Sequence, residues 1–394
     1  MRQRPDNPGN DPTENPTAGS TDHPAALPGL RILDFSRVLA GPFATMVLAD
    51  LGAEVTKVER PGSGDDTRAW GPPWDADGRS TYFDAVNRNK RSVVLDLQQP
   101  AGIAQAIALA GEADVLVENF RPGLLDELGL GYEALRDANP GLIYCSITGF
   151  GSSAKGRELP GYDLLVQAVG GLMSITGEPA GQPQKVGVAL IDVLAGLFAS
   201  VGILAALNHR HATGQGQLIR VDLLSSLLAA LVNQASSYTV GGVVPQRMGN
   251  EHPSIAPYAV FPTGVGELVL AVGNDRQFAS LCRVLEAPQL ADDARFCTNP
   301  ARVSNRAALR AELESLLVTR SAAEWASLLL DARVPAGVVN DIASAFELAE
   351  SLGLHPTVDL PVTGESSIRL ARNPIWLSAT PPTYRTAPPL LPFD

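Results

Sequence analysis

The chain has 394 residues, 45% of them apolar and 18% charged, with a formal net charge of −12 and only three cysteines, Cys145, Cys282 and Cys297. Length and composition are typical of a globular protein of roughly two to three domains. The negative charge argues against nucleic acid or an anionic membrane as a main partner, and the scattered cysteines argue against a disulfide framework or a zinc site.

The N-terminal segment and one apolar stretch bear on the location of the protein. Residues 1–26 contain five prolines and no Leu, Ile, Val or aromatic residue, so we expect a disordered tail without the apolar core of a secretory signal. Residues 186–207 are apolar enough to span a bilayer, but they contain Asp192. We expect a buried core helix there, with a membrane span as the alternative, and a cytoplasmic protein.

Strand-like and helical segments alternate from Gly29 onward, which indicates βαβ units and a parallel sheet. The fold class expected is therefore α/β. The predicted strands are 31–35, 54–58, 92–97, 114–119, 142–148 and 217–221. The predicted helices in this part are 43–51, 102–111 and 132–138.

The pattern changes after Asp192 to long helices, predicted at 193–209 and 222–238. A hairpin is expected at 258–273, followed by helices at 275–285, 305–317 and 322–332. A helix from Asp341 and strands near Val358 and at 367–370 then return to the first domain. The predicted division is a large domain at 27–225, a linker helix and small domain at 226–332, and a return to the large domain at 333–394.

Several common enzyme signatures are missing from the sequence. It contains no GxSxG, HExxH, GxxxxGK[ST] or EF-hand motif, and no GxGxxG follows the first strand. Serine hydrolases, zinc peptidases, P-loop enzymes and dinucleotide-binding enzymes each depend on one of these motifs. Those classes are therefore disfavoured.

Asp192 is the only charged residue between Lys185 and His209. Burying an ionised carboxylate is costly, but the N-terminus of a helix beginning at Val193 would favour the negative charge. Asp192 is then either a simple N-cap or a nucleophile held ionised at the helix end, and the two roles are compatible. The residues around it leave both interpretations open.

Basic residues follow or flank several predicted strands: Lys57, Arg60, the NRNKR run at 87–91, and Arg121. In open α/β sheets, ligands bind beyond the carboxyl ends of the strands. Ordinary solvated surface charge is the alternative for each residue alone. Their similar placement in an acidic chain favours an anion-binding site.

A chain of collinear motifs marks a family resemblance. They include LPGLRILDFSRVLAGPFATMVLADLGAEVTKVERPGSGDDTR, NRNKRSVVLDL, ADVLVENFRPG, GYDLLVQAVGGLMSITGE, ALID and GNEHPSIAPYAVF. Through these the chain resembles the class III CoA-transferases, the formyl-CoA and carnitine CoA-transferase or CaiB/BaiF type. Within the family the likeness is greatest to the succinyl-CoA:glutarate (hydroxymethylglutarate) transferases, through RVLAGPFATM, GDDTRAWGPP, VNRNK and YCSITGFG.

The resemblance implies a Rossmann-like large domain formed by both chain ends, a smaller inserted α/β domain and a homodimer of interlocked rings. It implies CoA transfer to a small carboxylic acid, in which Asp192 forms a mixed anhydride and then an aspartyl-CoA thioester. Coenzyme A is the implied cosubstrate, with no metal or redox cofactor.

The motifs also imply site residues. The implied CoA-binding positions are Val38, Leu39, Ala40, Arg60, Leu95, Asn119, Phe120, Arg121, Gly161 and Tyr162, with Asp163 in the same turn. Arg88 is expected to bind the distal carboxylate of a dicarboxylic acid, since a guanidinium pairs well with a carboxylate. Gly241 and Gly242 are expected to cover the substrate.

Two alternatives to the transferase stay open. Racemases of 2-methylacyl-CoA resemble this family but use a histidine base where this chain has Tyr162, and a tyrosine is poorly suited to deprotonating an α-carbon near neutral pH. A non-catalytic CoA-binding protein would bind CoA without forming a covalent adduct.

Overall fold

The computed structural model describes residues 24–362 and 366–392, so the tail predicted at 1–26 lies outside the described residues except for its last three positions. The chain divides into two compact units. Unit 1 comprises Met1–Gly170, Gly187–Ala235 and His355–Asp394, and unit 2 comprises Gly171–Val186 and Ser236–Leu354.

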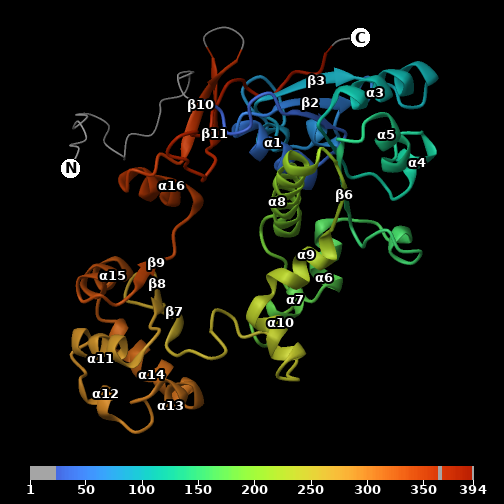
Figure 1. Cartoon of the computed structure of the whole chain (residues 1–394). Coiled ribbons are helices and arrows are strands. Elements are labelled where there is room, and N and C mark those ends of the chain that lie inside the picture. Colours follow the sequence, from blue (N-terminus) through green and yellow to red (C-terminus); the bar gives the residue numbers. More distant parts are fainter. Residues whose placement is uncertain (1–23, 363–365, 393–394) are drawn as a thin grey trace, which may run out of the picture. The chain divides into compact units, whose positions relative to one another are not determined.

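Unit 1 is built on a parallel sheet, which has six strands among the described residues in the order β3-β2-β1-β4-β5-β6. Its strands β2, β3 and β6 are labelled in Figure 1. The central strands β1 and β4 are buried along almost their whole length, as parallel strands covered on both faces must be. The predicted α/β class is thus confirmed. The strands are β1 (Arg31–Asp34), β2 (Glu54–Glu59), β3 (Lys90–Val94), β4 (Val115–Glu118), β5 (Ile143–Thr148) and β6 (Leu218–Asp222).

Successive side chains of β1 point to opposite faces of this sheet. Leu33 packs into an apolar cluster with residues of α3 (Pro100–Glu112) and α5 (Tyr132–Ala138). Its neighbour Asp34 points the other way and accepts a hydrogen bond from Thr45 of α1 (Ala40–Asp50). Helices therefore cover both faces, and the polar residues at the strand ends are fixed by packing on each side.

Helix α8 (Leu190–Thr213) packs against α1 through a stripe of small and branched residues. Gly196 permits close approach, because a Cβ atom there would lie only 2.5 Å from the carbonyl oxygen of Ala40. Among the described residues α8 is the helix long and apolar enough to cross a membrane by length and composition. The buried stripe is Ile191, Ala195, Ala199, Ile203 and Ala206, and the exposed face carries Leu197, Phe198, Val201 and Leu204.

Three predicted helices differ from the structure by more than two residues or by a division. The helix expected at 43–51 begins at Ala40, because Pro42 lies in the first turn, where no backbone N–H is needed. The helix expected at 193–209 begins at Leu190, which places Asp192 inside its first turn. The single helix expected at 222–238 is two helices, α9 (Leu223–Ala230) and α10 (Val232–Thr239), with a positive φ of 42° at Val232, the first residue of α10.

Unit 2 has its own apolar core around a short antiparallel sheet. The predicted hairpin is confirmed as β7 (Tyr258–Pro262) and β8 (Glu267–Ala271). A third strand, β9 (Ala336–Val338), pairs with β8 and lies beyond the domain end predicted at Ala332. The helices that surround this core are α11 (Asp275–Val284), α12 (Gln289–Asp292), α13 (Asn299–Ser304), α14 (Arg306–Leu317) and α15 (Ala322–Asp331).

The compact units divide the chain differently from the predicted boundaries at 225 and 332. Arg247 donates hydrogen bonds to the carbonyl oxygens of Ser174, Glu178 and Gly181, which attaches the segment 171–186 to unit 2. At the other end, unit 2 continues through β9 and α16 (Ile342–Ser351). No local pattern in the sequence signals the first of these attachments.

The two strands predicted near the C-terminus are confirmed as β10 (Thr357–Pro361) and β11 (Ser367–Ala371), which pair as an antiparallel hairpin in the part of unit 1 that resumes at His355. Val358 and Leu360 bury against Tyr384 in a small apolar cluster. The remaining helices of the described chain are short: α2 (Thr81–Asp84), α4 (Leu124–Glu127), α6 (Asp163–Val169) and α7 (Leu172–Ile175).

Candidate active site

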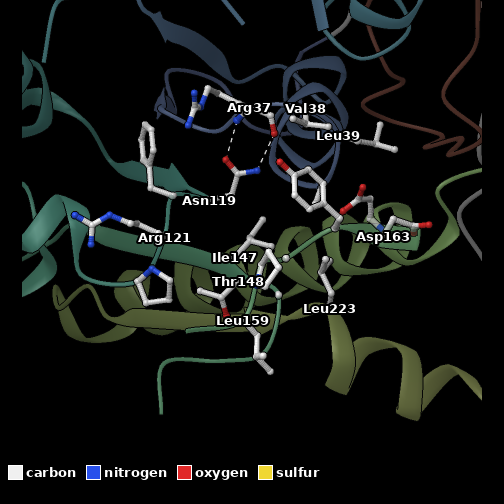
Figure 2. A pocket seen from close by; sticks show the side chains of 18 of the residues that line it. Arg37, Val38, Leu39, Asn119, Arg121, Ile147, Thr148, Leu159, Asp163 and Leu223 are labelled. Carbon is white, nitrogen blue, oxygen red and sulfur yellow. Dashed lines mark hydrogen bonds between the residues drawn. The ribbon is translucent and has the colours of Figure 1, made fainter. Parts of the chain in front are cut away.

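A cavity of about 330 Å³, the central cavity, lies beyond the carboxyl ends of β1, β4 and β5 in unit 1 (Figure 2). Open α/β sheets bind their ligands at this position, because the connections after neighbouring strands diverge there and leave a crevice. The cavity is lined by residues 37–40, 119–122, 147–149 and 159–163, together with Asp66, Arg157, Asp192 and Leu223.

The loop after β1 is held in an unusual backbone conformation at the cavity wall. Val38 has φ of 69°, a left-handed conformation that a β-branched residue adopts only under constraint. Asn119 supplies that constraint: its side-chain oxygen accepts from the backbone N–H of Arg37, and its amide donates to the carbonyl oxygen of Arg37 (Figure 2). Buried Lys57 adds a hydrogen bond to the carbonyl oxygen of Ser36. Val38, Leu39 and the start of α1 are thereby fixed at the cavity.

Asp192 lines the central cavity from the first turn of α8, but it does not cap that helix. Asp163 does so from α6: its Oδ1 atom accepts from the backbone N–H groups of Ile191 at 2.8 Å and Asp192 at 3.3 Å. The buried amide of Gln167 donates to the other oxygen of Asp163. The N-cap interpretation of Asp192 is therefore wrong, and among the described residues no hydrogen bond to its carboxylate is seen. That carboxylate is available for chemistry.

The electrostatic surroundings of Asp192 also differ from the sequence-based expectation. Burial, followed by the negative charge of Asp163, raises the pKa of Asp192 from 3.8 to about 7. The helix N-terminus was expected to keep this carboxylate ionised, but desolvation and the neighbouring carboxylate outweigh it. Raised basicity makes the carboxylate a better nucleophile once it is ionised, since it is less stabilised by its surroundings.

The pair of carboxylates predicts a pH effect for Asp163→Asn. The asparagine side chain can still accept from the backbone N–H groups of Ile191 and Asp192, so the cap of α8 is kept. Loss of the negative charge lowers the pKa of Asp192, because one cause of its rise disappears. The acidic limb of a plot of kcat/KM against pH should therefore move to lower pH. An unmoved limb in a folded variant would contradict the electrostatic coupling.

A second cavity of about 330 Å³, the side cavity, adjoins the first and shares Arg37 and Phe120 with it. The guanidinium of Arg37 lies 4.9 Å from the centre of the Phe120 ring, at the boundary between the two cavities. The walls of the side cavity are largely apolar, with Phe35, Val58, Leu95, Leu97, Phe120, Leu124 and Leu128 among its lining residues and Arg60 at the edge.

The two cavities bring together every residue predicted to bind CoA. The central cavity holds Val38, Leu39, Ala40, Asn119, Phe120, Arg121, Gly161 and Tyr162 beside Asp192. The side cavity holds Arg60, Leu95 and again Phe120. Their individual roles stay predictions.

Three of the six predicted basic residues, Lys57, Arg88 and Lys90, are buried in ion pairs and cannot contribute to an anion site. Lys57 lies 2.8 Å from Asp65, Lys90 lies 3.1 Å from Asp34, and all four side chains are fully buried. These charges are neutralised inside unit 1, where buried charges must be paired. Arg60 and Arg121 stay at the surface of the cavities, each in an ion pair with a carboxylate.

Arg88, predicted to bind a substrate carboxylate, is likewise committed elsewhere. Its guanidinium donates through Nε and Nη2 to Asp50 of α1, with a shortest distance of 2.7 Å, and through Nη1 to the carbonyl oxygen of Ala371. The side chain is only 3% exposed and lines neither cavity. The substrate role is therefore wrong in this structure, because Asp50 already occupies the guanidinium.

Gly241 and Gly242 follow α10 and belong to unit 2. They line neither the central nor the side cavity, both of which lie in unit 1. Gly242 has φ of 66°, a conformation suited to glycine. Their assignment to substrate binding stays a prediction.

Arg37 and Arg157 line the central cavity but were not singled out in the sequence. A signal existed for Arg37, which stands directly before the motif residues Val38 to Ala40 at the end of the first strand. Arg157 lies in a single 3-10 turn (Gly156–Glu158) whose surrounding sequence has no apolar periodicity, so nothing near it indicates a position at the cavity. The described residues 24–362 and 366–392 contain no cluster of three or more His, Cys, Asp or Glu suited to a metal ion.

The chain matches a model of CoA-transferase family III over residues 27–394. It is 45% identical over 379 residues to a succinate–glutarate CoA-transferase of Agrobacterium fabrum, covering 94% of this chain and 95% of the relative. It is 46% identical over 344 residues to a succinyl-CoA:glutarate CoA-transferase of Mus musculus, covering 87% and 79%.

Solved structures agree with this match. The crystal structure of a CAIB/BAIF family protein from Brucella suis superposes with a TM-score of 0.83 at 43% identity, covering 93% of this chain and 96% of that one. A Mycobacterium tuberculosis protein superposes with a TM-score of 0.85 at 31% identity, covering 94% and 98%. The chain therefore belongs to CoA-transferase family III, and it is a CoA-transferase.

Proposed function

We propose that the protein moves CoA from succinyl-CoA or a similar acyl-CoA to a small dicarboxylic acid, with Asp192 as the covalent nucleophile. The relatives support the substrate class: besides the glutarate enzymes, an Acetobacter aceti relative at 41% identity is named an acetyl-CoA:oxalate CoA-transferase. A Haloarcula hispanica relative at 40% identity is named a succinyl-CoA:mesaconate CoA-transferase. Glutarate, oxalate and mesaconate are all dicarboxylates.

In the proposed mechanism, a carboxylate oxygen of Asp192 attacks the thioester carbonyl of the donor, and CoA leaves as a thiolate. The product is a mixed anhydride between Asp192 and the donor acid. The thiolate then attacks the Asp192 carbonyl carbon, which releases the donor carboxylate and leaves an aspartyl-CoA thioester. The acceptor carboxylate attacks that thioester, which releases the CoA thiolate and forms a second mixed anhydride. The thiolate then attacks the acceptor carbonyl carbon of this anhydride, which forms the new acyl-CoA and frees Asp192.

The observation on which this proposal depends is the state of Asp192. Its carboxylate lies at the central cavity, it is not used in capping α8, and its pKa is raised to about 7 by burial and by Asp163. A structural aspartate in a first turn would bond to backbone N–H groups instead. An unengaged, basic carboxylate facing a cavity suits a nucleophile.

The proposal is tested by trapping the intermediate. Enzyme incubated with succinyl-CoA is quenched with hydroxylamine or borohydride, and the peptide containing Asp192 is examined by mass spectrometry. We expect modification at Asp192 only. In a second arm, acceptor labelled with ¹⁸O should pass one labelled oxygen to Asp192 and, in the next turnover, to the released donor acid. CoA transfer with no ¹⁸O in Asp192 and none in the released donor acid would rule out the anhydride route.

The same experiment separates the two alternatives. A non-catalytic CoA-binding protein would give no adduct. A racemase would exchange the α-proton of a 2-methylacyl-CoA with solvent deuterium and would need no acceptor acid. The central cavity has Tyr162, which is 67% exposed, and none of its lining residues is a histidine, so it lacks the histidine base that those racemases use.

We propose further that the chain acts in the cytoplasm as an interlocked homodimer, with unit 2 as a domain inserted into the Rossmann-like unit 1. Exposed apolar side chains support association. Unit 1 exposes four on α8, and α16 of unit 2 has no buried residue and exposes Ile342, Phe346 and Leu348. Contiguous apolar surface of this kind is typical of subunit interfaces. Light scattering coupled to size-exclusion chromatography should give the mass of two chains.

A further inference from the structure

We propose that Arg157 binds a phosphate group of the CoA moiety. The inference rests on the proposed function, since it requires that the central cavity binds CoA. CoA carries a diphosphate and a ribose 3′-phosphate, so its polar end needs cations, while the protein as a whole has a net charge of −12. Any such cation must therefore be a local one at the cavities.

Four arginines line the two cavities, and three of them already pair with carboxylates. Arg37 and Arg60 both pair with Asp66. Arg121 pairs with Glu127 through both of its terminal nitrogens, at 2.7 and 3.2 Å. A phosphate that used one of these guanidinium groups would compete with the carboxylate already bound to it.

Arg157 is the fourth, and among the residues that the structure describes it forms no ion pair with a carboxylate, although its charge helps to lower the pKa of nearby Glu127, after the larger effect of the Arg121 hydrogen bond. Its Nη2 atom donates to the carbonyl oxygen of Pro122 at 3.1 Å, and the side chain is otherwise exposed at the cavity. Gly123 lets the guanidinium lie against the loop, because a Cβ atom there would come within 2.6 Å of Nη2. One nitrogen thus fixes the group in place, and the remaining N–H donors are free for a phosphate, which guanidinium binds in a bidentate manner.

The position of Arg157 also suits the direction in which CoA must lie. The thioester has to reach Asp192, which is next to the cap provided by Asp163. Arg37 and Arg121 lie on the opposite side of the cavity from Asp163 (Figure 2), and Arg157 contacts the residue that follows Arg121. The phosphate-binding end of the cavity is therefore the end away from the nucleophile.

The test compares three thioesters with wild-type enzyme, Arg157→Met and Arg157→Lys: succinyl-CoA, succinyl-3′-dephospho-CoA and succinyl-pantetheine. Arg157→Met should lower kcat/KM for succinyl-CoA about 10-fold, equivalent to about 1.4 kcal/mol, through KM and not kcat. For the pantetheine thioester, which has no phosphate, the variant should equal the wild type. Arg157→Lys should recover part of the loss. The control, Arg136→Met, removes an exposed arginine that lines neither cavity and should change nothing.

The dephospho-CoA arm identifies the phosphate. If the loss persists with dephospho-CoA, Arg157 binds the diphosphate, and if it disappears, Arg157 binds the 3′-phosphate. An equal loss with all three thioesters, no loss, or an effect confined to the KM of the acceptor acid would overturn the proposal. A wild-type enzyme without transferase activity would instead overturn the proposed function, and calorimetry of CoA binding would then decide the role of Arg157 separately.

Discussion

Asp192→Asn is expected to lower kcat by on the order of 10⁴-fold or more while leaving CoA bound, because the amide has the shape of the carboxylate but cannot attack a thioester. Steady-state kinetics with succinyl-CoA and a dicarboxylate acceptor measure the first effect, and calorimetry with CoA measures the second. A variant that retained wild-type turnover would exclude covalent catalysis by this residue. Arg136→Met again provides a control, since Arg136 lines neither cavity.

The same substitution should not destabilise the protein at alkaline pH, which separates a lost nucleophile from a lost fold. The pKa of Asp192 is raised from 3.8 to about 7 by burial and then by Asp163, so the ionised form opposes folding. The free energy of unfolding of the wild type is therefore not reduced by this group below about pH 3.8. It falls as the pH rises, and the full reduction is reached above about pH 7. Asp192→Asn removes this reduction, so the free energy of unfolding of the variant, relative to that of the wild type, should be higher at pH 8 than at pH 5.

Arg88→Met is expected to lower the free energy of unfolding by about 3–5 kcal/mol, because it leaves Asp50 buried without its cation. Asp50 also accepts hydrogen bonds from Asn89 and Asn373, which do not replace the charge. Urea denaturation at neutral pH measures the loss. Burial already raises the pKa of Asp50 even with Arg88 present, so the loss should shrink as the pH falls and the carboxyl becomes neutral.

Two comparisons make this prediction specific to the buried ion pair. Arg91→Met removes an exposed arginine of β3 three residues away and should change the free energy of unfolding by no more than about 0.5 kcal/mol. In the fraction of Arg88→Met that is folded, KM for the acceptor acid should be unchanged. A normal stability combined with a raised KM would restore the substrate-binding role that the sequence suggested.

The site illustrates how far each kind of residue could be predicted. Arg121 was predictable from its place after a strand, because ligands bind where parallel strands end, whereas Val38 to Ala40 and Asn119 were predicted only through the family resemblance. Asp192 stood out as one charge in a long apolar segment. The capping of α8 by Asp163 was not predictable from the sequence, because Asp163 and Asp192 are 29 positions apart and neighbouring helices bring them together.

The sequence by itself determined the α/β class, the succession of elements along unit 1 and the identity of the one acidic residue in the apolar segment around α8, since these follow from local periodicity and composition. Only the tertiary structure decided which charges line the cavities and which are buried in ion pairs. Lys57, Arg88 and Lys90 look like surface cations in the sequence, yet each is buried against an aspartate from another element. The physical reason is that burial and ion pairing depend on partners distant in the chain, and such contacts leave no local pattern.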